Sequence, residues 1–195
     1  MKATGVLTNE HKYILRALNI LEQMAEKVEG GQNLDDRDVE FLLNFLHTFA
    51  DGHHQAKEES VLFPAMLAGE RCADYPQLCQ MIFEHDQERS LVEGLEEAMR
   101  TKKGEDFVYY AGRLTHILRT HIYKEDHILF RLADVTFTAE EDERVAQNLN
   151  DYDRPWQDKV LSAQLQQLNA LEWKYLGKTA SRVDSSEAAT SKART

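Results

Sequence analysis

Long segments with helical periodicity are the feature that most constrains the fold of this chain. Three prolines and nine glycines among 195 residues leave these segments largely uninterrupted. Within them, apolar side chains recur at the i, i+3, i+4 and i+7 spacing of an amphipathic helix. No segment shows the strict alternation that predicts a half-buried β-strand. The pattern therefore predicts an all-α protein.

Four periodic segments account for the first two thirds of the chain. They run from about 9 to 29, from 33 or 35 to about 64, from 74 to about 103, and from 106 to about 133. Pro64 is expected to end or kink the second helix. The apolar stripe of the fourth helix is expected to continue through Ile128 and Leu132. Helices of this length joined by short loops predict an up-and-down antiparallel four-helix bundle over residues 1–134.

A less regular portion follows the predicted bundle. Thr138 and Glu141 have the spacing of a capping box for a short helix, and leucines at helical spacing outline a last one. Residues 135–177 are therefore expected to form a C-terminal helical extension, which could fold back on the bundle or form a homodimer with a second copy. Residues 178–195 are polar and lack aromatic side chains, which predicts a disordered tail.

Charge and cysteine content exclude several partners. Lys and Arg total 23 against 34 Asp and Glu, a formal net charge of −11. Nucleic acids and anionic membranes require a basic face, so neither is an expected partner. No apolar run is long enough to cross a bilayer, and the first residues do not resemble a secretory signal. Cys72 and Cys79 fit no metal or redox spacing, so each is expected to be a packed or idle thiol in a reducing cytoplasm.

A repeated motif carries the chemistry. Residues 54–63 and 121–130 both read H-x-x-K-E-[ED]-x-x-L-F, and each copy follows a helix with one isolated histidine on its apolar face, His11 or His85. In each copy the His and Glu lie on one helix face, with β-carbons about 5–6 Å apart. Buried imidazoles and carboxylates without partners cost several kcal/mol, and a metal pair inside a bundle satisfies them. Imidazole with carboxylate suits iron, zinc or manganese, while the lack of thiolate ligands argues against a structural zinc site.

These motifs resemble those of hemerythrin-like proteins of the HHE cation-binding family. The resemblance covers about residues 6–134 and rests on both repeats and on the Glu84-His85-Asp86 triplet. It implies a four-helix bundle with two iron ions, bridged by Glu58, Glu125 and an oxo or hydroxo group. Zinc or manganese could substitute for iron. The iron ligands that it implies are His11, His54, Glu58, His85, His121 and Glu125.

The chain departs from the oxygen-carrying hemerythrins in its ligand pattern. Those proteins place a second histidine four residues after the third-helix histidine, where this chain has Arg89, and an aspartate five residues after the fourth-helix histidine. Asp126 matches the latter position, but Glu125 precedes it at the i+4 spacing. The pattern resembles di-iron proteins linked to iron–sulfur cluster repair, nitric oxide response and iron sensing. It implies a protein that handles O2, NO or peroxide, with an iron donor for repair or a sensing module as alternatives.

Several residues near the implied ligands have open roles. His53 is the nearest rival of His54, as a packed residue or as a neighbour of the ligands. Glu59 and Asp126 recur in both repeats, but adjacent helical residues point about 100° apart, which favours a surface ion pair or a contact with a ligand over ligation. Glu88 is compatible with a hydrogen-bond acceptor beside the centre or with an exposed rim position. The remaining histidines are expected to be structural: His47, His116 and His127.

Overall fold

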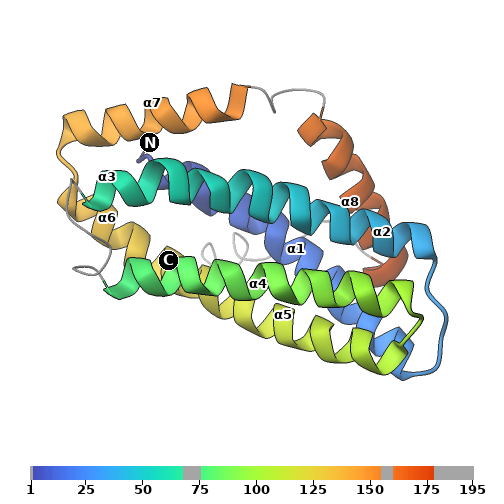
Figure 1. Cartoon of the computed structure of the whole chain (residues 1–195). Coiled ribbons are helices and arrows are strands. Elements are labelled where there is room, and N and C mark those ends of the chain that lie inside the picture. Colours follow the sequence, from blue (N-terminus) through green and yellow to red (C-terminus); the bar gives the residue numbers. More distant parts are fainter. Residues whose placement is uncertain (1, 68–75, 155–159, 178–195) are drawn as a thin grey trace, which may run out of the picture.

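The computed structural model describes residues 2–67, 76–154 and 160–177, and within them every regular element is a helix (Figure 1). Two of the long rods consist of several consecutive helical segments. The elements are α1 (Thr4–Glu29), α2 (Asp36–Phe45), η1 (Leu46–Gln55), η2 (Glu58–Leu62), α3 (Phe63–Leu67), α4 (Pro76–Arg100), α5 (Gly104–Lys124), η4 (Glu125–Leu129), α6 (Phe130–Thr136), α7 (Ala139–Asp153) and α8 (Val160–Leu176).

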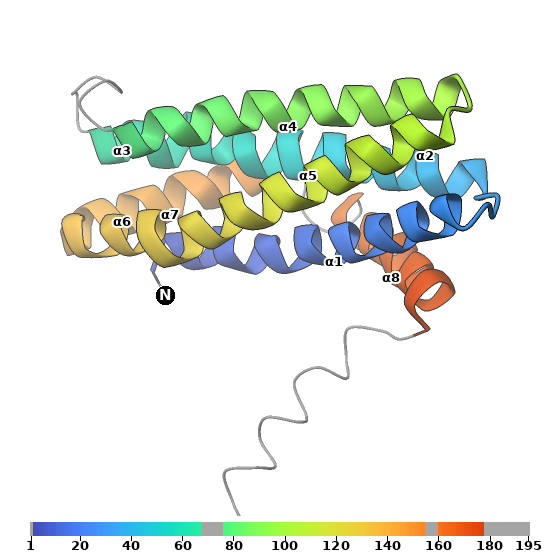
Figure 2. The same cartoon turned by 90° about the horizontal axis from the view of Figure 1, so that it is seen from below.

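Four rods lie side by side and form the bundle. They are α1, the continuous helix from α2 to α3, α4, and the continuous helix from α5 to α6 (Figures 1 and 2). Consecutive rods run in opposite directions (Figures 1 and 2), as in an up-and-down bundle. The prediction of an all-α bundle with additional C-terminal helices is confirmed. The second rod continues through Pro64 to Leu67 instead of ending there.

The interior of the bundle has two apolar clusters separated by a polar layer. One cluster is built around residues such as Ile14 and Leu18, and the other around residues such as Leu7 and Phe63. His11 lies between Leu7 and Ile14 on α1, and it is 1% exposed. Because apolar side chains close the interior on both sides of this layer, polar groups inside it have little access to water.

Both copies of the repeated motif contain a wide helical turn. The backbone N–H of Phe63 donates to the carbonyl of Glu58, and that of Phe130 donates to the carbonyl of Glu125, five residues back in each case. Such π-type turns are rare and occur often at functional sites. The extra residue in the turn rotates the buried face, so Leu129 is 3% exposed while Ile128 is 55% exposed. The expected continuation of the stripe through Ile128 and Leu132 is therefore wrong.

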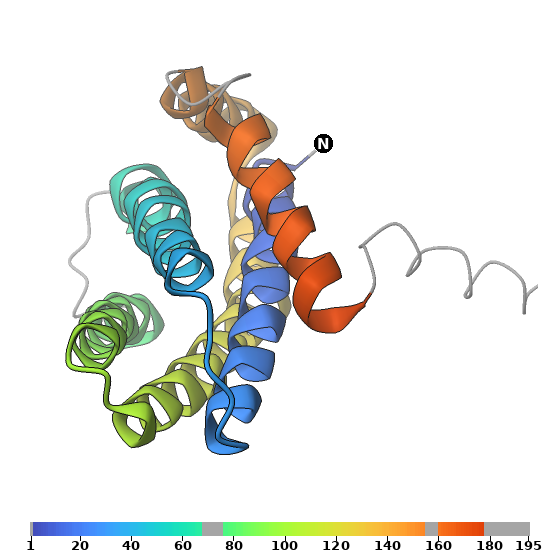
Figure 3. The ribbon, with the colours of Figure 1, turned by 90° about the vertical axis from the view of Figure 1, so that its right-hand side faces the viewer.

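The two C-terminal helices pack on opposite parts of the bundle. The capping box of α7 is present, with the Thr138 hydroxyl accepting from the Glu141 N–H and the Glu141 carboxylate accepting from the Thr138 N–H. Helix α7 adds Val145 and Leu149 to the apolar cluster around Phe63. Helix α8 crosses α1 (Figure 3), where its leucines join the other cluster. This stripe therefore faces its own chain, and the homodimer stays a prediction.

The structure also bears on the expectations for membrane-spanning segments and for the cysteines. Among the described residues, no helix combines the length and apolar character needed to cross a membrane. Cys79, in the first turn of α4, is disulfide-bonded, so the prediction of an idle thiol is wrong for this residue. Cys72 and the expected tail from 178 to 195 lie outside the described residues.

Candidate metal centre

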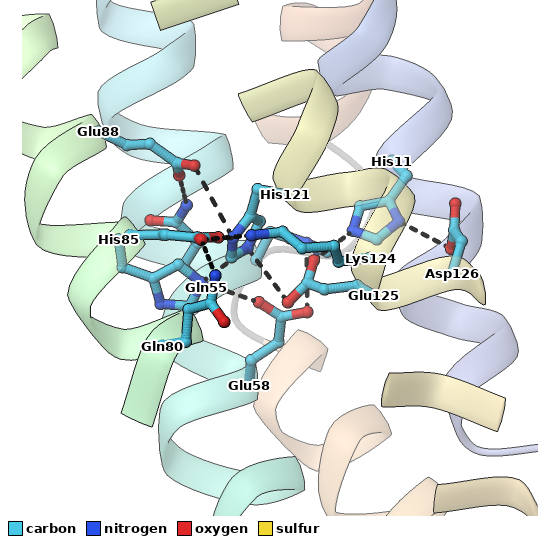
Figure 4. Close-up of polar contacts among 12 residues, drawn as sticks. His11, Gln55, Glu58, Gln80, His85, Glu88, His121, Lys124, Glu125 and Asp126 are labelled. Atoms are coloured by element: carbon cyan, nitrogen blue, oxygen red, sulfur yellow. Dashed lines mark hydrogen bonds and ion pairs between the residues drawn. The ribbon is translucent and has the colours of Figure 1, made fainter. Parts of the chain in front are cut away.

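All six implied ligands meet in the polar layer, and Figure 4 labels all of them except His54. Each is at most 3% exposed. They form two overlapping groups in which one possible ligand atom from each residue lies within 4.8 Å of the others. Site A consists of His11, His54, Glu58 and Glu125, and site B consists of Glu58, His85, His121 and Glu125.

Glu58 lies between the two sites. Its Oε1 is 3.5 Å from Nε2 of His54 in site A, and its Oε2 is 3.5 Å from Nε2 of His85 in site B. One carboxylate oxygen therefore faces each site.

Glu125 makes the matching connection from the opposite rod. Its Oε2 is 3.2 Å from Nε2 of His11, and its Oε1 is 3.2 Å from Nε2 of His121. Both carboxylates thus span both sites, which is the arrangement that a carboxylate-bridged metal pair requires.

The acid that follows each spanning glutamate holds a histidine of the other half of the chain. Glu59 Oε1 lies 2.7 Å from Nδ1 of His85, and Asp126 Oδ1 lies 3.0 Å from Nδ1 of His11. The hydrogen bond from His85 lowers the pKa of Glu59 to about 2, so this carboxylate is ionised and the ring Nδ1 must carry the proton. Both acids therefore contact an implied ligand, and Glu59 in addition forms an ion pair with the partly exposed Arg89.

The acid that precedes each isolated histidine has the same role toward the repeated motif. Glu10 Oε2 lies 2.9 Å from Nδ1 of His54, and Glu84 Oε2 lies 2.9 Å from Nδ1 of His121. Every Nδ1 in the centre is therefore bonded to a carboxylate. Such outer carboxylates fix the ring orientation and tautomer and leave Nε2 free to bind a metal.

A lysine of each motif contacts the acid that precedes an isolated histidine. Lys57 Nζ donates to Glu10 Oε1, and Lys124 Nζ donates to Glu84 Oε1. Sequence reasoning gave no role to these lysines or to Glu10, although the sequence contains a signal for them. The lysine recurs in both repeats, and a glutamate directly precedes each isolated histidine.

The two carboxylates that span the sites are buried, and their pKa values are shifted in opposite directions. Burial and the neighbouring charge of Glu125 raise the pKa of Glu58 well above its usual value. Burial also opposes ionisation of Glu125, but His121 and His11 outweigh it and lower the pKa of that residue. None of the four oxygens of these two glutamates has a hydrogen-bond partner. Bare buried acceptors of this kind are costly, and a bound cation would satisfy them.

The spacing and the protonation of two of the histidine rings also favour a bound cation. Nε2 of His85 lies 3.1 Å from Nε2 of His121. Two ring nitrogens at this distance attract each other only when a proton or a metal ion lies between their lone pairs. Burial lowers the pKa of His54 to about 4, which keeps this imidazole in the neutral form that binds metals.

The other histidines are not part of the centre. His53 is buried, and its Nε2 lies 3.2 Å from Asp153 Oδ1 and 3.5 Å from Glu10 Oε1. These three residues form a third group with metal-like spacing, but Lys57 contacts both acids, so a cation is already present there. The structure thus places His54, not His53, at the centre. The three histidines expected to be structural are exposed: His47, His116 and His127.

A cavity lies beside Glu88, whose carboxylate faces His121 of site B. It has a volume of about 230 Å³ and lies between η1, α4 and α5, with a mixed lining that includes the apolar Leu46 and Leu118 and the charged Asp51 and Arg89. Gln55 and Glu88 also line it, and the Gln55 amide donates to Glu88. Glu88 is 3% exposed, which excludes the exposed rim position among the two roles left open for it, and burial raises its pKa to about 7. Its second oxygen lies 3.9 Å from Nδ1 of His121 (Figure 4).

Comparison with protein families agrees with this site. The model of the hemerythrin HHE cation-binding domain matches residues 2–133. The chain therefore belongs to this family of cation-binding four-helix proteins, and its buried His and Glu groups are able to hold metal ions. No curated protein and no solved structure matches the chain.

Proposed function

We propose that this chain holds two iron ions in a carboxylate-bridged centre, completed by an oxo or hydroxo group, and handles O2, NO or peroxide there. The observation that carries the proposal is the sharing of Glu58 and Glu125 by two groups of ligands. A single-metal site would need only one oxygen of each carboxylate, whereas here each of the four oxygens faces a different histidine.

The donor set supports iron. Each site offers two imidazole nitrogens and two carboxylate oxygens, a combination that suits iron, manganese or zinc. Iron bound there would supply redox chemistry and coordination positions for an external ligand. The protein contributes four oriented imidazoles, each fixed through Nδ1 by a carboxylate, and an interior closed to bulk water.

The cavity beside site B supports a small external ligand. Its volume of about 230 Å³ is large enough for diatomic molecules or peroxide, and its lining combines apolar side chains with charged ones such as Asp51 and Arg89. Arg89, at the position where oxygen carriers have an additional histidine, does not enter the centre. Instead it pairs with Asp51 and Glu59 at 2.7 and 2.6 Å. Site B therefore has one fewer histidine than an oxygen carrier would place there.

Metal content and visible spectra test this function. After anaerobic loading with Fe(II), elemental analysis should give about two irons per chain, and air, peroxide or NO should each change the spectrum. His54→Ala and His121→Ala should each lower the iron content, because each removes a nitrogen from one site. His116→Ala is the matched control, since His116 is exposed on the same rod as His121, and it should retain the full iron content.

Other outcomes distinguish the alternatives. One zinc per chain, or no metal, contradicts the di-iron centre. Reversible loss of an oxygen adduct under argon favours oxygen carriage. Transfer of iron to an iron–sulfur acceptor without any reaction with NO or peroxide favours the iron-donor alternative.

A further inference from the structure

On each side of the centre, a lysine contacts a glutamate that in turn contacts a histidine. We call these contacts the site A relay (Lys57, Glu10 and His54) and the site B relay (Lys124, Glu84 and His121). The two relays have the same chemistry but are buried to different degrees. In the site A relay, Lys57 is 0% exposed and Glu10 is 11% exposed at the side chain. In the site B relay, Lys124 is 24% exposed. The sequence motif is the same in both halves, so the difference must come from what covers each relay.

Helix α7 provides the cover over the site A relay. Asp153, its last residue, places Oδ1 2.7 Å from Lys57 Nζ and 3.2 Å from His53 Nε2. Lys57 in turn contacts Glu10, and Glu10 holds Nδ1 of His54 at 2.9 Å. A continuous chain of polar contacts therefore runs from the end of α7 to a ligand nitrogen of site A.

This cover comes from outside the family domain. The family match ends at residue 133, whereas α7 spans Ala139–Asp153. On the opposite side, the only acid in contact with Lys124 among the described ion pairs is Glu84. Site B also lies beside the cavity, through Glu88, while the site A relay contacts Asp153 of α7.

We propose that α7 makes the two metal positions inequivalent, with Asp153 as a positioning residue that holds His54 through Lys57 and Glu10, so that site A exchanges its metal more slowly than site B. The inference rests on the proposed two-metal centre. Its physical basis is that a buried relay whose lysine is held by two carboxylates cannot rearrange without breaking desolvated ionic hydrogen bonds. The partly exposed relay at Lys124 can exchange its contacts with water.

Removal of iron by an excess of a chromophoric chelator tests this inference on the full, iron-loaded chain. The wild-type protein should lose iron in two phases of similar amplitude. Asp153→Ala should make the slow phase about 10-fold to 100-fold faster, which is the usual effect of losing an outer contact of a metal ligand. Asp153→Glu should restore most of the slow phase, because it returns the carboxylate.

Two matched variants assign the phases and the role. Glu84→Gln acts on the other relay and should accelerate the fast phase only. Asp142→Ala removes a different α7 contact, the hydrogen bond of 3.1 Å that Asp142 accepts from the Ala3 N–H, and should leave the slow phase unchanged. A purely structural role of Asp153 would lower the thermal midpoint without changing the ratio of the two phases.

The outcomes separate this inference from the proposed function. A single release phase in the wild type, or a slow phase in Asp153→Ala within twofold of the wild-type rate, overturns the inequivalence assigned to α7. Equal acceleration by Asp142→Ala would assign the effect to the docking of the helix and not to Asp153, which overturns the positioning role. A chain that takes up no metal contradicts the proposed function itself.

Discussion

Adjacent residues in the histidine motifs make different kinds of contact in the centre. In Glu10-His11, the histidine faces Glu125 while the glutamate holds His54. In the fourth rod, Glu125 spans both sites while the adjacent Asp126 holds His11. Because neighbouring side chains of a helix point about 100° apart, one dipeptide can supply an inner and an outer contact. This geometry explains why acids cluster beside the histidines in the sequence.

At the scale of single residues, we expect protons to compete with the metal ion for His11. Burial alone would lower the pKa of His11, but its contacts with Asp126 and Glu125 raise it to about 9. A metal ion that binds His11 near neutral pH must displace this proton, so the affinity should rise with pH up to about 9. The apparent association constant should increase at least about tenfold between pH 7 and 8 in competition titrations corrected for the chelator.

The control for this expectation changes the outer acid. Asp126→Asn removes the charge that raises the pKa of His11, so the pH dependence should become weaker in this variant. A metal affinity that is independent of pH from 7 to 8.5 in the wild type would show that the proton on His11 does not compete with the metal.

Wide turns decide which face of each helical rod is buried. Each repeat contains three consecutive apolar residues, 61–63 and 128–130, and the hydrophobic pattern is compatible with more than one register through them. The five-residue hydrogen bonds from Phe63 to Glu58 and from Phe130 to Glu125 select the register. The same turns begin at the two glutamates that span the sites, so the change of register occurs where the ligands are.

A pair of alanine substitutions tests this register. Leu129→Ala should lower the free energy of unfolding by about 2–5 kcal/mol, because Leu129 is 3% exposed within an apolar cluster. Ile128→Ala, the matched control at 55% exposure, should cost less than about 1 kcal/mol. Urea denaturation at constant metal content measures both. A larger cost at Ile128 would indicate an uninterrupted α-helical register.

Across the whole molecule, a polar layer divides the apolar interior into two clusters. The layer contains two spanning glutamates whose oxygens lack hydrogen bonds, and four histidines held by ionised acids. Its stability is therefore tied to what neutralises it. A ligand that binds only the folded chain stabilises it in proportion to the logarithm of its concentration over its dissociation constant.

Thermal unfolding should report this dependence. At an iron concentration about a thousandfold above the dissociation constant, the stabilisation of about 4 kcal/mol corresponds to a rise of roughly 10 °C in the midpoint for a chain of this size. Calcium is the control ion, since it prefers sites made only of oxygen ligands and should give a much smaller shift. An unchanged midpoint with iron would mean that the polar layer is stable without a metal.

Much of this architecture could be predicted from the sequence. Apolar periodicity indicated the four rods, and the repeated His and Glu spacing, with the two isolated histidines, indicated the residues that meet in the centre. These are local properties, since a spacing of three or four residues places side chains on one helix face whatever the rest of the chain does. The capping box of α7 could be predicted for the same reason.

Contacts between distant segments were decided only by the tertiary structure. The structure placed His54 rather than His53 at the centre, directed Asp126 to His11, and brought Asp153 to Lys57 across 96 positions of sequence. It also set the register after each wide turn. A helical pattern records which side chains share a face, but it holds no information about which helix lies opposite or which hydrogen-bond register a turn adopts, because the packing of the whole chain determines both.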